Sequence, residues 1–104
     1  MLKYLRSFLI PYIDMNYEQL EKKAFKLGAS QFGISNRFNK RFYVIYNNKT
    51  IHCGSKTGKT YIDHHNTYLR KNWIARHSKI QNSNGEYVIK IKDSPSFWSH
   101  NLLW

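Results

Sequence analysis

The segment from residue 41 to residue 54 predicts a β-hairpin, and no other part of the chain constrains the fold as strongly. Arg41–Tyr46 is rich in aromatic and β-branched residues and is apolar at both alternating sets of positions, a pattern typical of a strand inside a sheet. Asn47-Asn48-Lys49 predicts a tight turn, and Thr50–Gly54 predicts the returning strand. We therefore expect an antiparallel sheet in which the first of these strands is central.

A central strand needs a second neighbour, and the C-terminal part of the chain offers one. The run Asn82-Ser83-Asn84-Gly85 is typical of a turn. In Glu86–Lys92, which follows, apolar and polar residues alternate as they do in a half-buried strand. We expect this segment to be the third strand, beside the hairpin. Residues 29–40 are rich in Gly, Ser and Asn and predict a loop.

Helix signals stand near both ends of the chain. Residues 16–28 have helical spacing of apolar residues, with Asn16 as a cap and Gly28 as a stop. Ser94 followed by Pro95 is typical of the cap and first position of a helix. That last helix is almost wholly apolar, and we expect it to dock into the core because large aromatic residues dominate cores.

A further helix is predicted over Thr67–Ile80, with Asn66 as its cap. Leu69, Trp73 and Ile80 share a narrow arc of this helix, with His77 beside them. The opposite side is mostly basic, so the sequence predicts an amphipathic helix with a basic outer face.

Together these elements predict an α+β protein, a small single domain with a three-stranded antiparallel sheet (the hairpin plus one strand) and about three helices. The 104 residues suffice for one domain, and the 41% hydrophobic content suffices for a core. The single cysteine, Cys53, permits no internal disulfide, so we expect a reducing compartment.

The N-terminal residues Met1–Asp14 resemble a signal peptide only superficially. The apolar stretch Phe8–Ile13 is too short and contains Pro11. No other segment approaches the ~18 apolar residues of a membrane span. We expect a soluble intracellular protein without a membrane span, in which residues 1–15 are a peripheral segment.

Positive charge is concentrated in the middle of the chain. The net charge is +11, and residues 37–79 hold ten Lys and Arg against the single acid Asp63. A field of this kind indicates an anionic partner, although a solvated surface is the alternative. The candidate nucleic-acid-binding residues are Arg37, Lys40, Arg41, Lys56, Lys59, Arg70, Lys71, Arg76 and Lys79.

The run from Gly54 to Thr60 resembles a phosphate-binding P-loop but lacks its spacing. The motif needs four residues between its glycines, and here there are three, because Cys53 stands where the first glycine belongs. The segment after it does not predict a helix. We therefore expect no nucleotide cofactor, and a flexible loop whose Lys56 and Lys59 contact backbone phosphates.

The histidines offer two further hypotheses. His52, His64, His65, His77 and His100, with Cys53, lack the paired spacing of structural zinc ligands, so we expect no metal site. The order His64, His65, Asn72, His77 after a hairpin is compatible with a metal-dependent nuclease, which needs a base and a cation at the scissile phosphate. The alternative is that these residues are structural, and we assign no catalytic residue.

Several blocks together resemble a family of short, uncharacterised proteins of nucleocytoplasmic large DNA viruses (giant viruses). The blocks are Lys40-Arg41-Phe42-Tyr43-Val44, Ile51-His52-Cys53-Gly54, Tyr61-Ile62-Asp63-His64-His65, Trp73-Ile74-Ala75-Arg76-His77, Ser94-Pro95-Ser96-Phe97-Trp98-Ser99 and Leu102-Leu103-Trp104. Cys53 and His100-Asn101 depart from the family pattern. The resemblance makes residues 37–104 the family-like core. It implies a viral origin, in the host-cell cytoplasm or nucleus or in the virion, and supplies no catalytic residues.

The sequence thus favours a small, basic, non-enzymatic viral protein that binds nucleic acid, DNA or RNA, non-specifically through phosphate contacts. The first alternative is a minor capsid or scaffold protein that contacts an acidic viral protein. The second is the metal-dependent nuclease.

Overall fold

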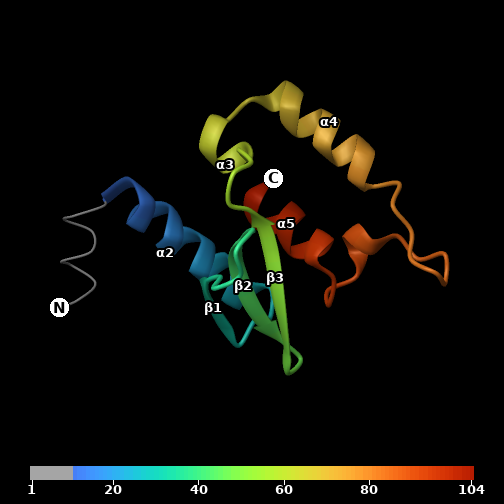
Figure 1. Cartoon of the computed structure of the whole chain (residues 1–104), viewed down its shortest axis with the longest axis horizontal. Helices are drawn as coiled ribbons and strands as arrows, with labels where there is room; N and C mark the ends of the chain where they lie inside the picture. The colour runs from blue at the N-terminus through green and yellow to red at the C-terminus, as the bar shows by residue number, and fades with distance from the viewer. Residues whose placement is uncertain (1–10) are drawn as a thin grey trace.

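The computed structural model describes the backbone of residues 11–104 and the side chains of residues 17–104. The fold is α+β, with a three-stranded antiparallel sheet in the order β1-β2-β3 and four α-helices in the described part (Figure 1). No helix in this part is long and apolar enough to span a membrane. Most of the peripheral segment expected over residues 1–15, and most of the signal-like stretch, lies outside the described residues.

The hairpin forms as predicted, from β2 (Lys40–Tyr46) and β3 (Lys49–Ser55). β2 is the central strand, and Val44 pairs with Ile51 in β3 and with Phe32 in β1. Asn47 and Asn48 have φ angles of 52° and 63°. Asn tolerates this left-handed conformation, and two such residues in succession make the tight turn that suits the twist of a hairpin.

The third strand is not the one that the sequence predicts. It is β1 (Gln31–Ile34), inside the segment expected to be a loop. Gly33 there makes room for a neighbour rather than breaking the strand, because a Cβ would lie 2.5 Å from Cε1 of the Tyr43 ring. Residues 86–92 instead hold the short 3-10 helix η1 (Val88–Lys90) and one isolated bridge between Gln81 and Tyr87. Within this segment Ile89 is buried, whereas Tyr87 is 46% exposed.

Helices α2 (Pro11–Lys26) and α5 (Pro95–Leu103) pack on the same core as the sheet. Residues from every one of these elements form a continuous buried cluster: Leu20, Ala24, Ala29, Phe32, Phe42, Val44, Ile51, Cys53, Trp98, Leu102 and Leu103. The expected docking of the C-terminal helix into the core is confirmed. Ser94 caps α5 as predicted, since its Oγ accepts the amide of Phe97 at 3.3 Å.

The start of α2 differs from the prediction. The helix begins at Pro11, so Asn16 lies inside it and cannot be its cap. Proline is well suited to the first turn of a helix, because it lacks only an amide that would be unpaired there. The stop is as predicted: Gly28 follows the helix with a φ of 110°, a conformation open to glycine.

The short α3 (Tyr61–His64) was not predicted, whereas α4 (Thr67–His77) was. Asn66 caps α4 as expected, because its Oδ1 accepts the amides of Tyr68 and Leu69 at 3.0 and 3.1 Å. The apolar arc is mostly unburied: Trp73 is buried, but Leu69 is 44% exposed, and Ile80 lies beyond the helix end and is 45% exposed. In Figure 1, α4 arches away from the sheet instead of lying on it.

Candidate nucleic-acid interface

A hollow of about 370 Å³ lies where the α4 region meets the rest of the protein. Four parts of the chain form it: the start of β2, the end of β3 with the loop after it, one side of α4, and the N-terminal half and end of α5. The residues that line it are Asn39, Lys40, Gly54, Ser55, Gly58, Lys59, Thr60, Trp73, His77, Pro95, Ser96, Ser99 and Trp104.

One part of the lining, which we call the cationic wall, carries cations and hydroxyl groups. Lys40 and Lys59 lie in it, and neither ammonium group has an ion-pair or hydrogen-bond partner among the side chains described. Ser96 and Ser99 occupy one face of α5, three residues apart, and their hydroxyls likewise make no hydrogen bond within residues 17–104. None of the described lining residues is acidic. Unpaired ammonium and hydroxyl donors around a concave surface are suited to an anion.

A second part of the lining, which we call the aromatic wall, consists of Trp73, His77 and Trp104. The Trp73 ring stacks on His77 with centroids 3.9 Å apart and planes at 13°, and on Trp104 at 5.1 Å and 9°. Beyond Trp104 lies His64, at 5.6 Å. The four rings make a continuous row, and three of them line the hollow.

The position of α4 depends on this row and on one arginine. Nε of Arg70 donates to the Trp104 carbonyl at 2.6 Å, and the guanidinium carbon lies 5.0 Å from the centre of the Tyr61 ring. His77 Nδ1 donates to the Trp73 carbonyl at 2.9 Å, which fixes the imidazole against the indole. Arg70, predicted as a phosphate ligand, thus also joins α4 to the end of α5.

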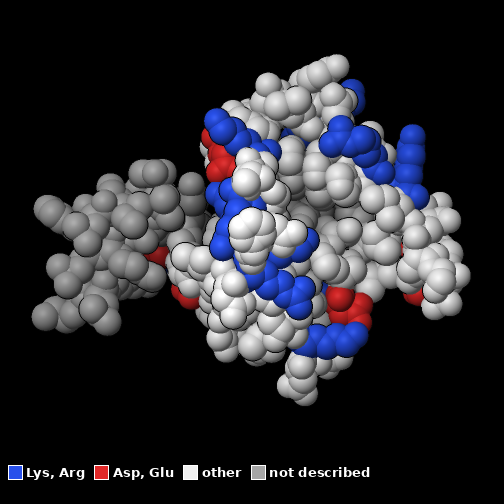
Figure 2. Space-filling model, in the orientation of Figure 1, with Lys and Arg blue, Asp and Glu red and all other residues white. Residues whose placement is uncertain are grey.

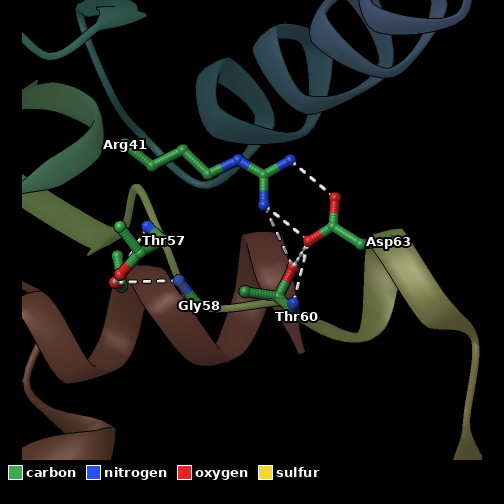
Figure 3. A network of polar contacts seen from close by, with 6 residues as sticks. Arg41, Thr57, Gly58, Thr60 and Asp63 are labelled. Carbon is green, nitrogen blue, oxygen red and sulfur yellow. Dashed lines mark hydrogen bonds and ion pairs between the residues drawn. The ribbon is translucent and has the colours of Figure 1, made fainter.

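Arg41 and Asp63 fix the loop that forms the cationic wall (Figure 3). The guanidinium makes two hydrogen bonds to the carboxylate, at 2.7 and 2.8 Å. Asp63 also accepts the amide and the hydroxyl of Thr60, at 2.8 and 2.9 Å. These contacts hold the pKa of Asp63 well below its usual range, and the hydrogen bonds from Arg41 contribute most. Because its charge is neutralised, Arg41 is unlike the other predicted phosphate ligands.

The segment that resembles a P-loop turns its amides inward. Oγ of Ser55 accepts the amides of Thr57 and Gly58, at 3.3 and 3.1 Å, and the amide of Lys56 donates to the Asn39 carbonyl (Figure 3 shows the Gly58 contact). These amides cannot cradle a phosphate in this arrangement. The side chains of Lys56 and Lys59 are exposed and are the part of the loop available to an anion.

The remaining predicted cations fall into two groups on either side of the hollow. Arg37, Lys40, Lys56 and Lys59 belong to the sheet end and its following loop, while Lys71, Arg76 and Lys79 are exposed along α4 and just beyond it. Figure 2 shows basic side chains in a band over the middle of this face and again over α4, with a recessed, uncharged surface between them. The basic side chains visible on this face are thus divided by the recess.

The residues of the nuclease hypothesis do not converge. His64 and His77 stand at opposite ends of the ring row, with two indole rings between them. His64 Nδ1 accepts the amide of Asn66 at 2.9 Å, and His65 lies against Tyr61 with a φ of 53°. Within the described part of the chain, no group of three or more His, Cys, Asp and Glu residues could hold a metal ion.

Sequence reasoning missed the residues of α5 that line the hollow. Ser96 and Ser99 carry no local signal, because only the docking of α5 brings them into the lining of the hollow. Trp73 and Trp104 were expected to be packing residues, and they are, but they also form the aromatic wall.

Residues 31–77 match a family of unknown function (DUF5754). The matched segment runs from the start of β1 to the end of α4 and includes Lys40, Lys59, Trp73 and His77, but not α5. No curated protein and no solved structure matches the chain.

Proposed function

We propose that this chain binds nucleic acid non-specifically, through phosphate contacts made in and around the hollow. The observation that carries the proposal is the lining itself: two lysines without acidic partners and two unpaired serine hydroxyls, and no acid among the described lining residues. Lys, Arg and Ser side chains are the usual phosphate ligands in nucleic-acid complexes, and such contacts carry no sequence information.

The distribution of charge supports the same function. Lys56 stands in the loop that lines the hollow and Arg37 three residues before Lys40, and Lys71, Arg76 and Lys79 add cations along α4 and just beyond it. A partner that lies across the hollow can reach both groups, and a polyanion meets a row of cations better than a small anion does. The place in a virion rests on the resemblance to viral proteins, and the binding proposal is independent of it.

The test is the affinity for labelled single- and double-stranded DNA over a series of salt concentrations. With ~4–6 phosphate contacts, log affinity falls against log salt with a slope of about −0.9 per contact on duplex. The double substitution Lys40→Ala and Lys59→Ala should weaken binding and reduce the slope by about two contacts.

The control removes the same charge from α2, with Lys22→Ala and Lys26→Ala, since both lysines are exposed there and neither lines the hollow. Equal losses in the two double variants would show that only net charge matters and would overturn the assigned site. Weak binding of the unmodified protein at low salt would overturn the function.

An acidic protein partner is the second candidate, and the exposed apolar residues of the α4 region favour it. Tyr68 is 71% exposed, Leu69 44% and Ile80 45%, and they accompany the cations of α4. A protein interface combines such apolar contacts with complementary charge. This function predicts that Leu69→Ser weakens capture of an acidic partner while leaving the affinity for nucleic acid unchanged.

A further inference from the structure

A phenylalanine is almost fully exposed beside the hollow. Phe38, in the turn between β1 and β2, is 95% exposed, the highest value among the large hydrophobic residues described. It follows Arg37 and directly precedes Asn39 and Lys40, which line the hollow. The Asn39 carbonyl accepts the amide of Lys56, so the turn touches the cationic loop. Phe38 contributes almost nothing to the core, and its surroundings are cationic.

The walls of the hollow differ in chemistry in the way that the parts of a nucleotide do. Ammonium and hydroxyl groups in the lining suit a phosphate, and the stacked rings of His77, Trp73 and Trp104 give the same lining an aromatic surface against which a base can pack. The volume of about 370 Å³ falls in the range of pockets that take small ligands.

We infer that the nucleic acid is single-stranded, that the hollow takes one nucleotide with its base along the aromatic wall, and that Phe38 stacks on a nearby base. This inference rests on the proposed function and narrows its substrate class. In a duplex the base faces are covered by neighbouring pairs, so neither the hollow nor Phe38 can reach them. In a single strand the faces are open, and cationic grooves with aromatic platforms are the usual way of binding it.

The experiment compares three polyanions: a single-stranded oligothymidylate of about 12 nucleotides, a duplex with the same number of phosphates, and inorganic polyphosphate of similar charge, which has no bases. Affinity and tryptophan fluorescence are measured for each. Of the three tryptophans, Trp73 and Trp104 line the hollow and Trp98 is fully buried. The oligothymidylate should bind most tightly and quench the fluorescence, and polyphosphate should bind weakly without quenching.

Two variants separate the contribution of base stacking from that of the phosphate contacts. Phe38→Ala should weaken oligothymidylate binding about tenfold, the usual cost of losing one stacked base, and leave polyphosphate binding unchanged. Its control is Phe25→Ala, which removes a half-exposed phenylalanine from α2. Ser96→Phe should fill the hollow and abolish the quenching, and Ser83→Phe adds the same ring to an exposed turn instead.

The outcomes distinguish this inference from the function on which it rests. Equal affinity for the single strand and the duplex, without quenching and without an effect of Phe38→Ala, would overturn the inference and leave phosphate binding intact. If polyphosphate bound as tightly as the oligothymidylate, the inference would likewise be overturned and phosphate binding would stand. Failure to bind any of the three polyanions at low salt would overturn the function itself.

Discussion

Two regions of this protein are held together in different ways. The body, consisting of α2, the sheet and α5, encloses the continuous hydrophobic core. The arm, residues 61–87 with α3 and α4, has one buried residue, Trp73. Burial of apolar area stabilises the body. Apart from Ile62, which packs against the core, the arm depends on a ring stack, an arginine and an ion pair. The hollow lies where the two meet, so the docking of the arm determines its shape. The proposed binding can therefore be lost there without unfolding the body.

The largest effect should come from the body. Trp98 is fully buried, and its Nε1 donates to the Lys92 carbonyl at 2.5 Å. Trp98→Ala leaves a cavity and an unpaired carbonyl, and should lower the free energy of unfolding by about 3–5 kcal/mol. Urea unfolding measures this. A loss below about 1 kcal/mol would contradict the division into body and arm.

Trp73→Ala should have a smaller and local effect, a loss of about 2 kcal/mol, because the released arm carries little other buried area. Hydrogen exchange should become faster in α4 and stay slow in β2 and β3. Binding of nucleic acid should weaken because the hollow loses a wall. Faster exchange throughout the sheet would show that the arm is part of the same cooperative unit.

The ion pair between Arg41 and Asp63 joins β2 of the body to α3 of the arm. The two side chains are 25% and 28% exposed, so Arg41→Met should cost about 1 kcal/mol. The matched control is Lys49→Met, which breaks the pair with Asp93, whose side chains are 65% and 43% exposed. That change should have almost no effect on thermal unfolding. Equal losses of stability in Arg41→Met and Lys49→Met would show that the Arg41–Asp63 pair has no special role.

Acid should weaken the same connection. The pKa of Asp63 is lower in the folded protein than in the unfolded chain, chiefly through Arg41. The resulting stability is present above the unfolded value of about 3.9 and declines as the pH falls below it, because the unfolded chain takes up the proton first. Asp63→Asn should reduce this decline in urea unfolding at pH values above and below 4. An unchanged pH profile would exclude Asp63 as its source.

The elements that the sequence predicted correctly are those with local causes. The two asparagines of the hairpin turn and the caps Asn66 and Ser94 act on residues within a few positions, and all are found as expected. β1 was missed because Gly33 and Ser35 resemble loop residues, whereas the partners that make the segment a strand lie in β2. Residues 86–92 have the pattern of a strand but make only a single bridge, from Tyr87 to Gln81.

The candidate site was predictable only in part, because some of its features are local in the sequence and others depend on distant residues. Charge is visible in composition, so most of the cations that flank the hollow could be named. Whether a cation is free depends on distant residues: Arg41 meets Asp63 across 22 positions, while Lys40, beside it in sequence, has no partner among the described side chains. Ser96, Ser99 and the aromatic wall required the three-dimensional arrangement.

The most direct test of the central claim is hydrogen exchange of the protein with and without the nucleic acid that binds most tightly in the salt series. If the site lies between body and arm, slowed exchange should appear on both sides of the hollow, in residues 54–60, in α4 and at the start of α5, and not in the outer turns of α2. Protection confined to α2, or to the exposed face of α4 alone, would contradict it.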